Sequence, residues 1–231
     1  MSGQIPVILQ ARMSSGRLPG KMLLSVGGRI LFDRVVERCR QSREISEVIV
    51  ATSSDPSDNA LAERCASQGL KYHRGPLLDV AERFASAVRF ARCEAFVRIC
   101  GDSPFIDPAL IDQAVVAYRG FNVDLVTNTF PRTFPKGVSV EVVRAQAFFA
   151  ALPRMTAAGE REHVTAVFYR LAGEFRIHGI RNDEDLSGEN LCVDTAADLE
   201  RIDAAFKTLG PRASACGWRE ALAAVREAQL S

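Results

Sequence analysis

The sequence predicts an α/β protein with a doubly wound, mostly parallel sheet and a small mixed β/α lobe. Apolar runs of strand length alternate with amphipathic helical stretches over the first hundred residues. The first run, residues 5–9, is apolar at every position, which is typical of a strand buried on both faces at the centre of a sheet. Beyond residue 120 the alternation stops, and residues 138–143 follow a period-two pattern, so this part is predicted to be mixed.

The first half divides into alternating helices and strands. In residues 30–40 apolar side chains recur on one helical face, and charged side chains lie mostly opposite. Residues 108–118 begin with Pro108, which is favoured in the first turn of a helix. After the first strand, further strands are predicted at 47–52, 71–73 and 95–100, and helices at 30–40, 58–68, 78–92 and 108–118.

The second half contains no regular strand–helix repeat. Pro and Gly interrupt residues 129–137, which are predicted to form a loop between strands at 124–128 and 138–143. The remaining strands are predicted at 175–180 and 190–193, and the remaining helices at 145–152, 160–171, 196–209 and 218–229.

Composition limits the classes of function. The 231 residues are 47% hydrophobic, enough to bury a sizeable core, and the formal net charge of +1 argues against nonspecific nucleic-acid binding. No apolar stretch reaches the roughly 18 residues of a membrane span, and no signal-like segment opens the sequence. We therefore expect a cytoplasmic protein with a small-molecule ligand and no membrane partner. The six cysteines are scattered without a C-x-x-C pair and are predicted to be reduced core thiols.

A loop of small residues follows the first strand and carries three cations. Arg12, Arg17 and Lys21 are interleaved with Ser, Gly and Pro, and small residues allow backbone N–H groups to approach a ligand closely. Three fixed positive charges favour a ligand with several negative charges, such as a di- or triphosphate. A Walker A loop is excluded, because its glycine spacing differs and no Ser or Thr follows the lysine. A solvated surface loop remains the alternative.

Two aspartates stand directly after predicted strands, Asp102 in VRIC-GD and Asp194 in LCV-D. Carboxylate oxygens brought together at strand ends are hard ligands that Mg²⁺ prefers, with triphosphate oxygens and water completing its coordination shell. Helix capping is the alternative, because Asp194 and Thr195 precede the helix predicted from residue 196.

The loop and the two aspartates resemble motifs of the sugar cytidylyltransferase family. QAR at 10–12 and SGRLPGK at 15–21 are similar to the signature loop of that family. GD at 101–102 and VDT-x-x-DL at 193–199 resemble its two metal carboxylates.

Two further segments resemble nucleotide-contacting elements of the same family. They are RG at 74–75 followed by DV-x-x-R at 79–83, and ATS-x-D at 51–55, which lies beside the base in the family. An ordinary turn, an amphipathic helix and a helix cap are their alternative readings. The resemblance implies a nucleotide-binding set of Gln10, Ala11, Arg12, Met13, Ser15, Gly16, Arg17, Lys21, Thr52, Ser53, Asp55, Arg74, Gly75, Val80, Arg83, Gly101 and Asp102.

The segment GEREHVT at 159–165 resembles the branch of the family that makes spore-coat and other surface polysaccharides. The loop at 128–141 is similar to the acceptor loop of that branch, but Lys136 and Ser139 stand where Asp is usual. This departure favours an acceptor that carries an anionic group. The resemblance implies an acceptor-binding set of Asn128, Arg132, Glu141, Arg161, Glu162 and His163.

The resemblance implies transfer of CMP from CTP to a sugar hydroxyl, giving a CMP-sugar and pyrophosphate. Arg17, Lys21, Asp102 and Asp194 would be the catalytic residues, and the two aspartates would hold Mg²⁺. The family pattern also implies a homodimer and a Rossmann-like nucleotide-diphospho-sugar transferase fold. Within one domain of residues 1–231, about 1–120 would bind nucleotide, 121–190 would form the acceptor and dimer lobe, and 191–231 would close the domain.

Two other functions remain open at this point. One is a glycosyltransferase of the same architecture, which would consume a nucleotide-sugar. Arg17 and Lys21 argue against it, because a diphosphate-sugar needs less positive charge in that loop. The other is a non-catalytic subunit that binds a nucleotide-sugar, against which the presence of Asp102 and Asp194 argues.

Overall fold

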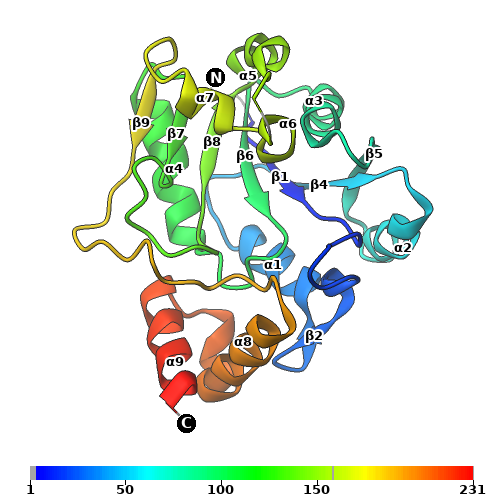
Figure 1. The fold of residues 1–231 in the computed structure, drawn as a ribbon, viewed down its shortest axis with the longest axis vertical. Coiled ribbons are helices and arrows are strands. Elements are labelled where there is room, and N and C mark those ends of the chain that lie inside the picture. The colour runs from blue at the N-terminus through cyan, green and yellow to red at the C-terminus, as the bar shows by residue number, and fades with distance from the viewer. Residues whose placement is uncertain (1–3, 158, 231) are drawn as a thin grey trace.

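The computed structural model describes residues 4–157 and 159–230, and a seven-stranded sheet forms its centre (Figure 1). The strand order is β5-β4-β1-β6-β8-β7-β9, and β2 and β3 form a separate short hairpin. The strands are β1 (Val7–Gln10), β2 (Ser25–Val26), β3 (Arg29–Ile30), β4 (Val48–Ser53), β5 (Lys71–Gly75), β6 (Ala95–Cys100), β7 (Leu125–Thr127), β8 (Glu141–Arg144) and β9 (Ile177–Gly179).

The sheet is parallel on one side and mixed on the other. β5, β4, β1 and β6 run parallel, whereas β8 is antiparallel to both β6 and β7, and β9 is parallel to β7. The first strand lies between β4 and β6, as its apolar sequence predicts. The predicted doubly wound, mostly parallel α/β class is confirmed.

Helices cover both faces of the sheet. They are α1 (Leu31–Arg40), α2 (Asn59–Ser67), α3 (Val80–Ala91), α4 (Pro108–Gly120), α5 (Ala145–Ala151), α6 (Glu160–His163), α7 (Ala166–Arg170), α8 (Ala196–Leu209) and α9 (Trp218–Leu230). Short 3₁₀ turns occur at Lys21–Leu23, Pro56–Asp58, Leu152–Arg154 and Gly210–Ser214.

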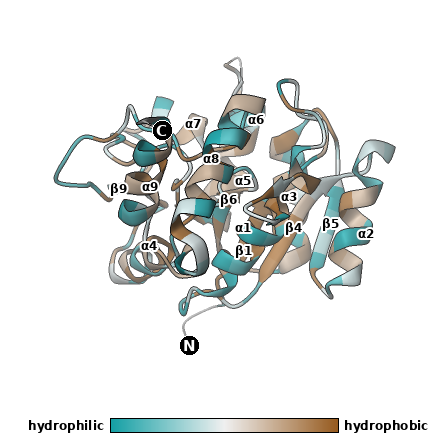
Figure 2. Cartoon of the chain, turned by 90° about the horizontal axis from the view of Figure 1, so that it is seen from below, coloured by the Kyte–Doolittle hydropathy of each residue, from teal (hydrophilic) through white to brown (hydrophobic). Residues whose placement is uncertain are grey.

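Alternate residues of β1 face two separate hydrophobic cores. Val7 and Leu9 belong to a core shared with α1, α2, α4, α8 and α9, whereas Ile8 belongs to a core shared with α3, α5 and α7. Because both faces of the strand are buried, the sequence shows a continuous apolar run. Figure 2 shows hydrophobic residues along β4 and more hydrophilic ones on the flanking helices.

Two predicted elements of the second half are wrong. The helix expected at 160–171 is broken into α6 and α7 by Val164, whose backbone φ of 46° lies outside the helical region. Residues 190–193 form no strand, because their backbone makes isolated bonds instead of a ladder. Leu191 N–H donates to the Lys136 carbonyl at 2.8 Å, and Val193 N–H donates to the Asp102 carbonyl at 2.9 Å.

A third element is shorter than expected. The strand predicted at 138–143 begins only at Glu141, because the Asn128 side chain takes the preceding backbone groups. Asn128 Nδ2 donates to the Val138 carbonyl at 2.8 Å, and its Oδ1 accepts from Val140 N–H at 2.9 Å.

The six cysteines are free thiols, and three of them, Cys39, Cys65 and Cys216, are buried. Within residues 4–157 and 159–230, no helix combines the length and apolar character needed to cross a membrane.

Candidate active site

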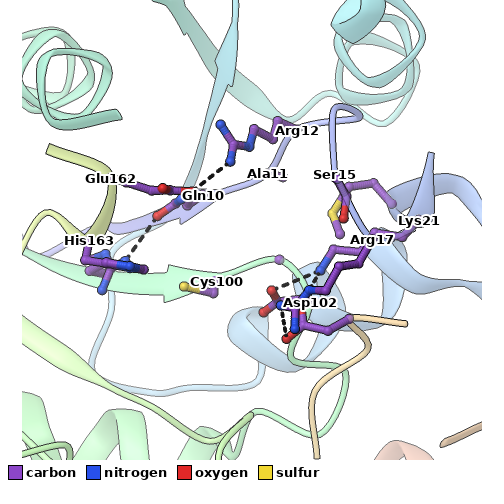
Figure 3. Close-up of a pocket in the computed structure, with 15 residues that line it drawn as sticks. Gln10, Ala11, Arg12, Ser15, Arg17, Lys21, Cys100, Asp102, Glu162 and His163 are labelled. Carbon is purple, nitrogen blue, oxygen red and sulfur yellow. Dashed lines mark hydrogen bonds and ion pairs between the residues drawn. The ribbon is translucent and has the colours of Figure 1, made fainter. Parts of the chain in front are cut away.

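A cavity of about 400 Å³ opens at the carboxyl ends of β1 and β6. The chain leaves β1 toward β4 on one side and reaches β6 on the other, so this is the topological switch point where doubly wound sheets bind ligands. Figure 3 shows side chains of the loop after β1 facing others from β6 and α6 across the cavity. The lining residues are Gln10, Ala11, Arg12, Ser15, Gly16, Arg17, Lys21, Met22, Arg98, Cys100, Gly101, Asp102, Glu162, His163 and Asp194.

The loop after β1 is held in a compact turn. The Met13 carbonyl accepts hydrogen bonds from Ser15 N–H at 2.9 Å and Gly20 N–H at 2.8 Å. Gly20 has a φ of 75°, which a residue with a side chain rarely adopts, and it delivers the chain into the 3₁₀ turn that begins at Lys21. The buried Asp58 anchors the loop, because its carboxylate accepts from Met13 N–H at 2.6 Å and from Ser53 N–H at 2.9 Å.

Lys21 joins the two predicted metal carboxylates. Its Nζ lies 3.1 Å from Asp102 Oδ2 (Figure 3). It also lies 2.9 Å from Asp194 Oδ1 and donates to the Val193 carbonyl at 2.8 Å. Its side chain is only 9% exposed, whereas those of Asp102 and Asp194 are 26% and 28% exposed. The structure therefore brings residues from positions 21, 102 and 194 into one ionic cluster.

Asp194 does not cap helix α8, because Thr195 takes that role, so its carboxylate can point toward Lys21. Thr195 accepts from Asp198 N–H, and Asp198 in return accepts from Thr195 N–H, which forms a capping box at the start of α8. Of the two capping candidates, Thr195 is thus the cap. The exposed Arg17 also reaches Asp194, with its Nη2 2.9 Å from Oδ2.

The charges of the cluster favour the ionised forms of Lys21 and Asp194. Burial alone would lower the pKa of Lys21, but the charge of Asp102 and the hydrogen bond to Asp194 outweigh it, so the pKa is raised. Burial would raise the pKa of Asp194, but the hydrogen bond and charge of Lys21, together with Arg17, lower it. Lysine and aspartate therefore form an ion pair at neutral pH.

The short helix α6 is fastened over the cavity by three ion pairs. Glu162 receives Arg12 Nη2 at 3.1 Å, and Glu160 receives Arg170 Nε at 2.6 Å. Arg161 donates through Nε to Asp79 at 2.9 Å and does not line this cavity. The positive φ at Val164 ends this helix and leaves Glu162 and His163 at the cavity wall.

Eight of the residues predicted to bind nucleotide do not line this cavity. Arg74 Nε donates to the Ser53 carbonyl at 2.7 Å, and its Nη2 donates to the Asp55 carbonyl at 2.9 Å. Asp55 caps a 3₁₀ turn by accepting from Ser57 N–H at 2.9 Å, which is the capping geometry given above as its alternative. The residues that do not line the cavity are Met13, Thr52, Ser53, Asp55, Arg74, Gly75, Val80 and Arg83.

Arg83, which is also absent from the cavity lining, is a fully buried cation. Its Nη1 donates to the carbonyls of Pro76 at 2.7 Å and Leu77 at 3.0 Å, and Arg12 Nη1 approaches the same Leu77 carbonyl at 3.5 Å. Burial, followed by the charge of Arg12, lowers the Arg83 pKa to about 10. Its Nε and Nη2 have no hydrogen-bond partner within the described chain. Arg83 thus fixes the loop at residues 76–77, whose Leu77 carbonyl also contacts Arg12.

A second cavity of about 230 Å³ adjoins the first and shares Arg98, Cys100 and His163 with it. Glu141 lies in its wall, where Oε2 accepts from Arg98 Nη1 at 2.5 Å and Oε1 accepts from Thr165 at 2.7 Å and from the Tyr169 hydroxyl. The lining residues are Arg98, Cys100, Thr129, Arg132, Ser139, Glu141, His163, Thr165, Ala166 and Tyr169.

The predicted acceptor residues are divided between the two cavities and the core. Arg132 lines the second cavity and donates to Ser139 Oγ at 3.2 Å, with no carboxylate partner in residues 4–157 and 159–230. Asn128 is buried and braces the backbone before β8. The exposed Lys136, whose charge favoured an anionic acceptor in the sequence, lines neither cavity.

Several residues of the site were not predicted from the sequence. Arg98 has a detectable signal, since a cation inside an otherwise apolar strand is unusual, and its Nη2 also contacts Gln10 Oε1 at 3.2 Å. Asp58 looks like an ordinary helix-start residue, and Tyr169 lies in a segment expected to be continuous helix, so neither is distinguished by pattern. The remaining unpredicted lining residues are Met22, Cys100, Thr129, Ser139, Thr165 and Ala166.

Comparison with known proteins places this geometry in context. A family profile described as cytidylyltransferase matches residues 6–213. The chain is 32% identical over 213 residues to the spore coat polysaccharide biosynthesis protein SpsF of Bacillus subtilis, covering 89% of this chain and 87% of that protein. It is 30% identical over 237 residues to 3-deoxy-manno-octulosonate cytidylyltransferase of an Anaeromyxobacter species, covering 87% of this chain and 96% of that protein.

The fold has a similar counterpart among solved structures. A cytidylyltransferase from Leptospira borgpetersenii superposes with a TM-score of 0.91 at 24% identity, covering 98% of this chain and 95% of the other. At that identity the superposition concerns the fold alone.

Proposed function

Because the chain belongs to the cytidylyltransferase family, we propose that it transfers CMP from CTP to a hydroxyl of an acidic sugar and releases pyrophosphate. The observation that carries this proposal is the cluster of Lys21 with Asp102 and Asp194, beside Arg17 and Arg12, at the carboxyl ends of β1 and β6. The similarity to SpsF supports use of the product in surface polysaccharide or glycan synthesis.

The proposed reaction needs alignment and charge neutralisation more than a covalent nucleophile. The acceptor oxygen forms a bond to the α-phosphorus as the bond to the pyrophosphate oxygen breaks. The leaving electron pair remains on pyrophosphate, and the hydroxyl proton passes to solvent water. Arg12, Arg17 and Lys21 line the same cavity and would bind the triphosphate and the departing pyrophosphate. Gly101 lines this cavity and lets the chain after β6 pack closely against β1, since a Cβ there would lie 3.0 Å from the Gln10 carbonyl oxygen.

The residues present fit a magnesium ion that arrives with phosphate. Asp102 and Asp194 offer oxygen donors that converge on one cation, and no group of three potential protein ligands occurs in the described ranges. Phosphate and water oxygens would therefore complete the shell. When bound there, Mg²⁺ would supply charge neutralisation at the α-phosphate.

The nucleoside is proposed to lie against the loop after β1 and the Leu77 carbonyl. Arg12 and Arg83 both donate to that carbonyl, which fixes the loop that follows the RG segment. In this proposal Arg74, Asp55 and the buried β4 residues act by supporting the wall instead of by direct contact.

The acceptor is proposed to bind in the second cavity, with its acidic group on Arg132. A guanidinium can hold a carboxylate through two parallel hydrogen bonds, and Arg132 has only neutral oxygens as partners in the described chain. His163 borders both cavities and would contact the acceptor near the α-phosphate. Glu141 would shape the wall, because Arg98 already neutralises its charge.

Residence in the cytoplasm, assembly as a homodimer and the division into nucleotide, acceptor and closing segments belong to the same proposal. The first is an expectation from the sequence, and the other two are implied by the family resemblance. The continuous sheet from β6 through β8 to β7 and β9 is compatible with a nucleotide half fused to an acceptor lobe.

A pyrophosphate-release screen tests the function. The protein, Mg²⁺ and each of the four nucleoside triphosphates are incubated with a panel of 2-keto acidic sugars and their neutral counterparts. We expect release with CTP and an acidic sugar only. Release of a nucleoside diphosphate from a nucleotide-sugar, with no pyrophosphate under any condition, would instead support a glycosyltransferase. Nucleotide binding without turnover would support a binding subunit.

A further inference from the structure

Lys21 fills a position with the chemistry of a cation site. Three oxygens surround its ammonium group, one each from Asp102, Asp194 and the Val193 carbonyl, at 3.1, 2.9 and 2.8 Å. The lysine side chain is 9% exposed, so the ammonium has little access to water. The same two carboxylates are the proposed metal ligands, and one side-chain cation already pairs with both.

A free divalent ion would have to displace this ammonium. Loss of both carboxylate partners would leave a largely buried charge with one carbonyl as its remaining partner, which is strongly unfavourable. Arg17 adds a second cation on Asp194, so a metal approaching alone also meets charge repulsion. A triphosphate changes this balance, because its oxygens can receive both cations while leaving the carboxylates to the metal.

The cluster is built so that such an exchange is possible. Lysine is a point charge on a flexible stem, so it can move without a change of backbone. Arg17 is 67% exposed, and Gly16 beside it has open space around its α-carbon. Both lie on the loop that lines the cavity where the triphosphate is proposed to bind.

We propose that Lys21 closes the Asp102–Asp194 pair to free divalent metal, so that metal enters only together with a triphosphate that takes over the Lys21 ammonium. The inference rests on the proposed function for the triphosphate. Its consequence for the nucleotide-free protein can be measured without turnover. The site then binds the metal and the triphosphate together as one complex. It does not bind the metal first and the nucleotide afterwards.

The test measures Mn²⁺ binding to the nucleotide-free protein by the loss of the free-ion signal in electron paramagnetic resonance. We expect Lys21→Met to bind one Mn²⁺ at least ~10-fold more tightly than the wild type. Lys207→Met is the matched control, because Lys207 pairs with Asp203 on the surface of α8, away from the cavity, and it should behave as the wild type. Adding Asp194→Asn to Lys21→Met should remove the gained site.

Equal Mn²⁺ affinity of the wild type and Lys21→Met would overturn the inference, as would a gain that survives Asp194→Asn. Circular dichroism checks the fold of each variant, and Lys21→Gln gives the same comparison if the methionine variant does not fold. In the wild type, CTP or ATP should raise the water-proton relaxation caused by protein-bound Mn²⁺; no rise with either would also count against the inference. The proposed function fails separately, if no acidic sugar supports pyrophosphate release.

Discussion

The two cavities use ion pairs in different ways. In the nucleotide cavity Lys21 meets two carboxylates that are 26% and 28% exposed, and its partners come from loops after β6 and before α8. In the acceptor cavity Arg98 and Glu141 are 12% and 4% exposed and belong to adjacent strands, β6 and β8. Thr165 and Tyr169 add further hydrogen bonds to Glu141.

This difference separates charges that can be exchanged from charges that are fixed. The carboxylates of the Lys21 cluster reach solvent, so a triphosphate can replace them as partners of the buried ammonium. Breaking the Arg98–Glu141 pair instead leaves an uncompensated buried charge. We infer that the cations of the nucleotide cavity exchange their carboxylate partners for phosphate when the ligand binds. The acceptor cavity keeps its shape while a sugar enters and leaves.

The largest effect should follow the loss of an exchangeable carboxylate. Asp194→Asn should lower turnover by about 10³-fold, because one proposed metal ligand and the partner of Lys21 are removed together. Asp183→Asn, at an exposed position outside both cavities, should leave turnover unchanged. Initial rates of pyrophosphate release measure the effect, and near-wild-type turnover in Asp194→Asn with an intact fold would contradict it.

The fixed pair should instead affect stability. Glu141→Gln should lower the free energy of unfolding by about 3 kcal/mol, because Arg98 is left buried without its charge partner. Urea unfolding measures the change. Glu174→Gln removes the partner of Arg154 in an exposed pair and should cause no measurable loss. A Glu141→Gln protein as stable as the control would remove the distinction between the two cavities.

Arg132 tests whether the acceptor cavity binds an acidic group. Arg132→Met should raise the KM for the acidic sugar by ~10-fold and leave the KM for CTP unchanged, because a carboxylate would lose its bidentate partner. Lys136→Met serves as the comparison, since this residue lines neither cavity. A larger increase in this KM for Lys136→Met than for Arg132→Met would contradict the prediction. It would mean that Lys136, and not Arg132, binds the acidic group of the acceptor.

The smallest effect concerns pH. The pKa of Asp194 is lowered in the folded protein, so the unfolded chain binds more protons in acid, and the stability contributed by this group is present above its unfolded pKa of roughly 3.9. That contribution should be lost as pH falls through the folded value and should stay below about 1 kcal/mol, because water screens the group. Urea unfolding of the wild type and Asp194→Asn from pH 3 to 7 should therefore converge only at the acidic end.

The first half of the fold was more predictable than the second, for a physical reason. The buried parallel strands and their helices carry strong periodic patterns, so β1, β4, β6 and α1 were predicted close to their observed bounds. In the second half, side-chain and isolated backbone bonds replace regular ones, as at Asn128 and Leu191, and a strained residue breaks a helix at Val164. These events depend on tertiary contacts that no local pattern records.

The site follows the same division. The cations at 12, 17 and 21 and the carboxylates at 102 and 194 stand out in the sequence, and the structure brings them to one cavity. The ion pairs between them cannot be predicted from the sequence, because they join residues that are separated by 81 and by 173 positions. The resemblance pointed to Glu141 and His163, whereas the Arg98–Glu141–Tyr169 network became visible only in three dimensions.

Transfer of label from CTP tests the central claim most directly. With CTP labelled at the α-phosphorus, Mg²⁺ and an acidic sugar, the label should appear in a product that contains both CMP and the sugar. With CTP labelled at the γ-phosphorus, the label should appear only in pyrophosphate, and Asp194→Asn should form both products about 10³-fold more slowly. Appearance of the γ-label on the sugar, or of the α-label only in free CMP or CDP, would contradict nucleotidyl transfer by this site.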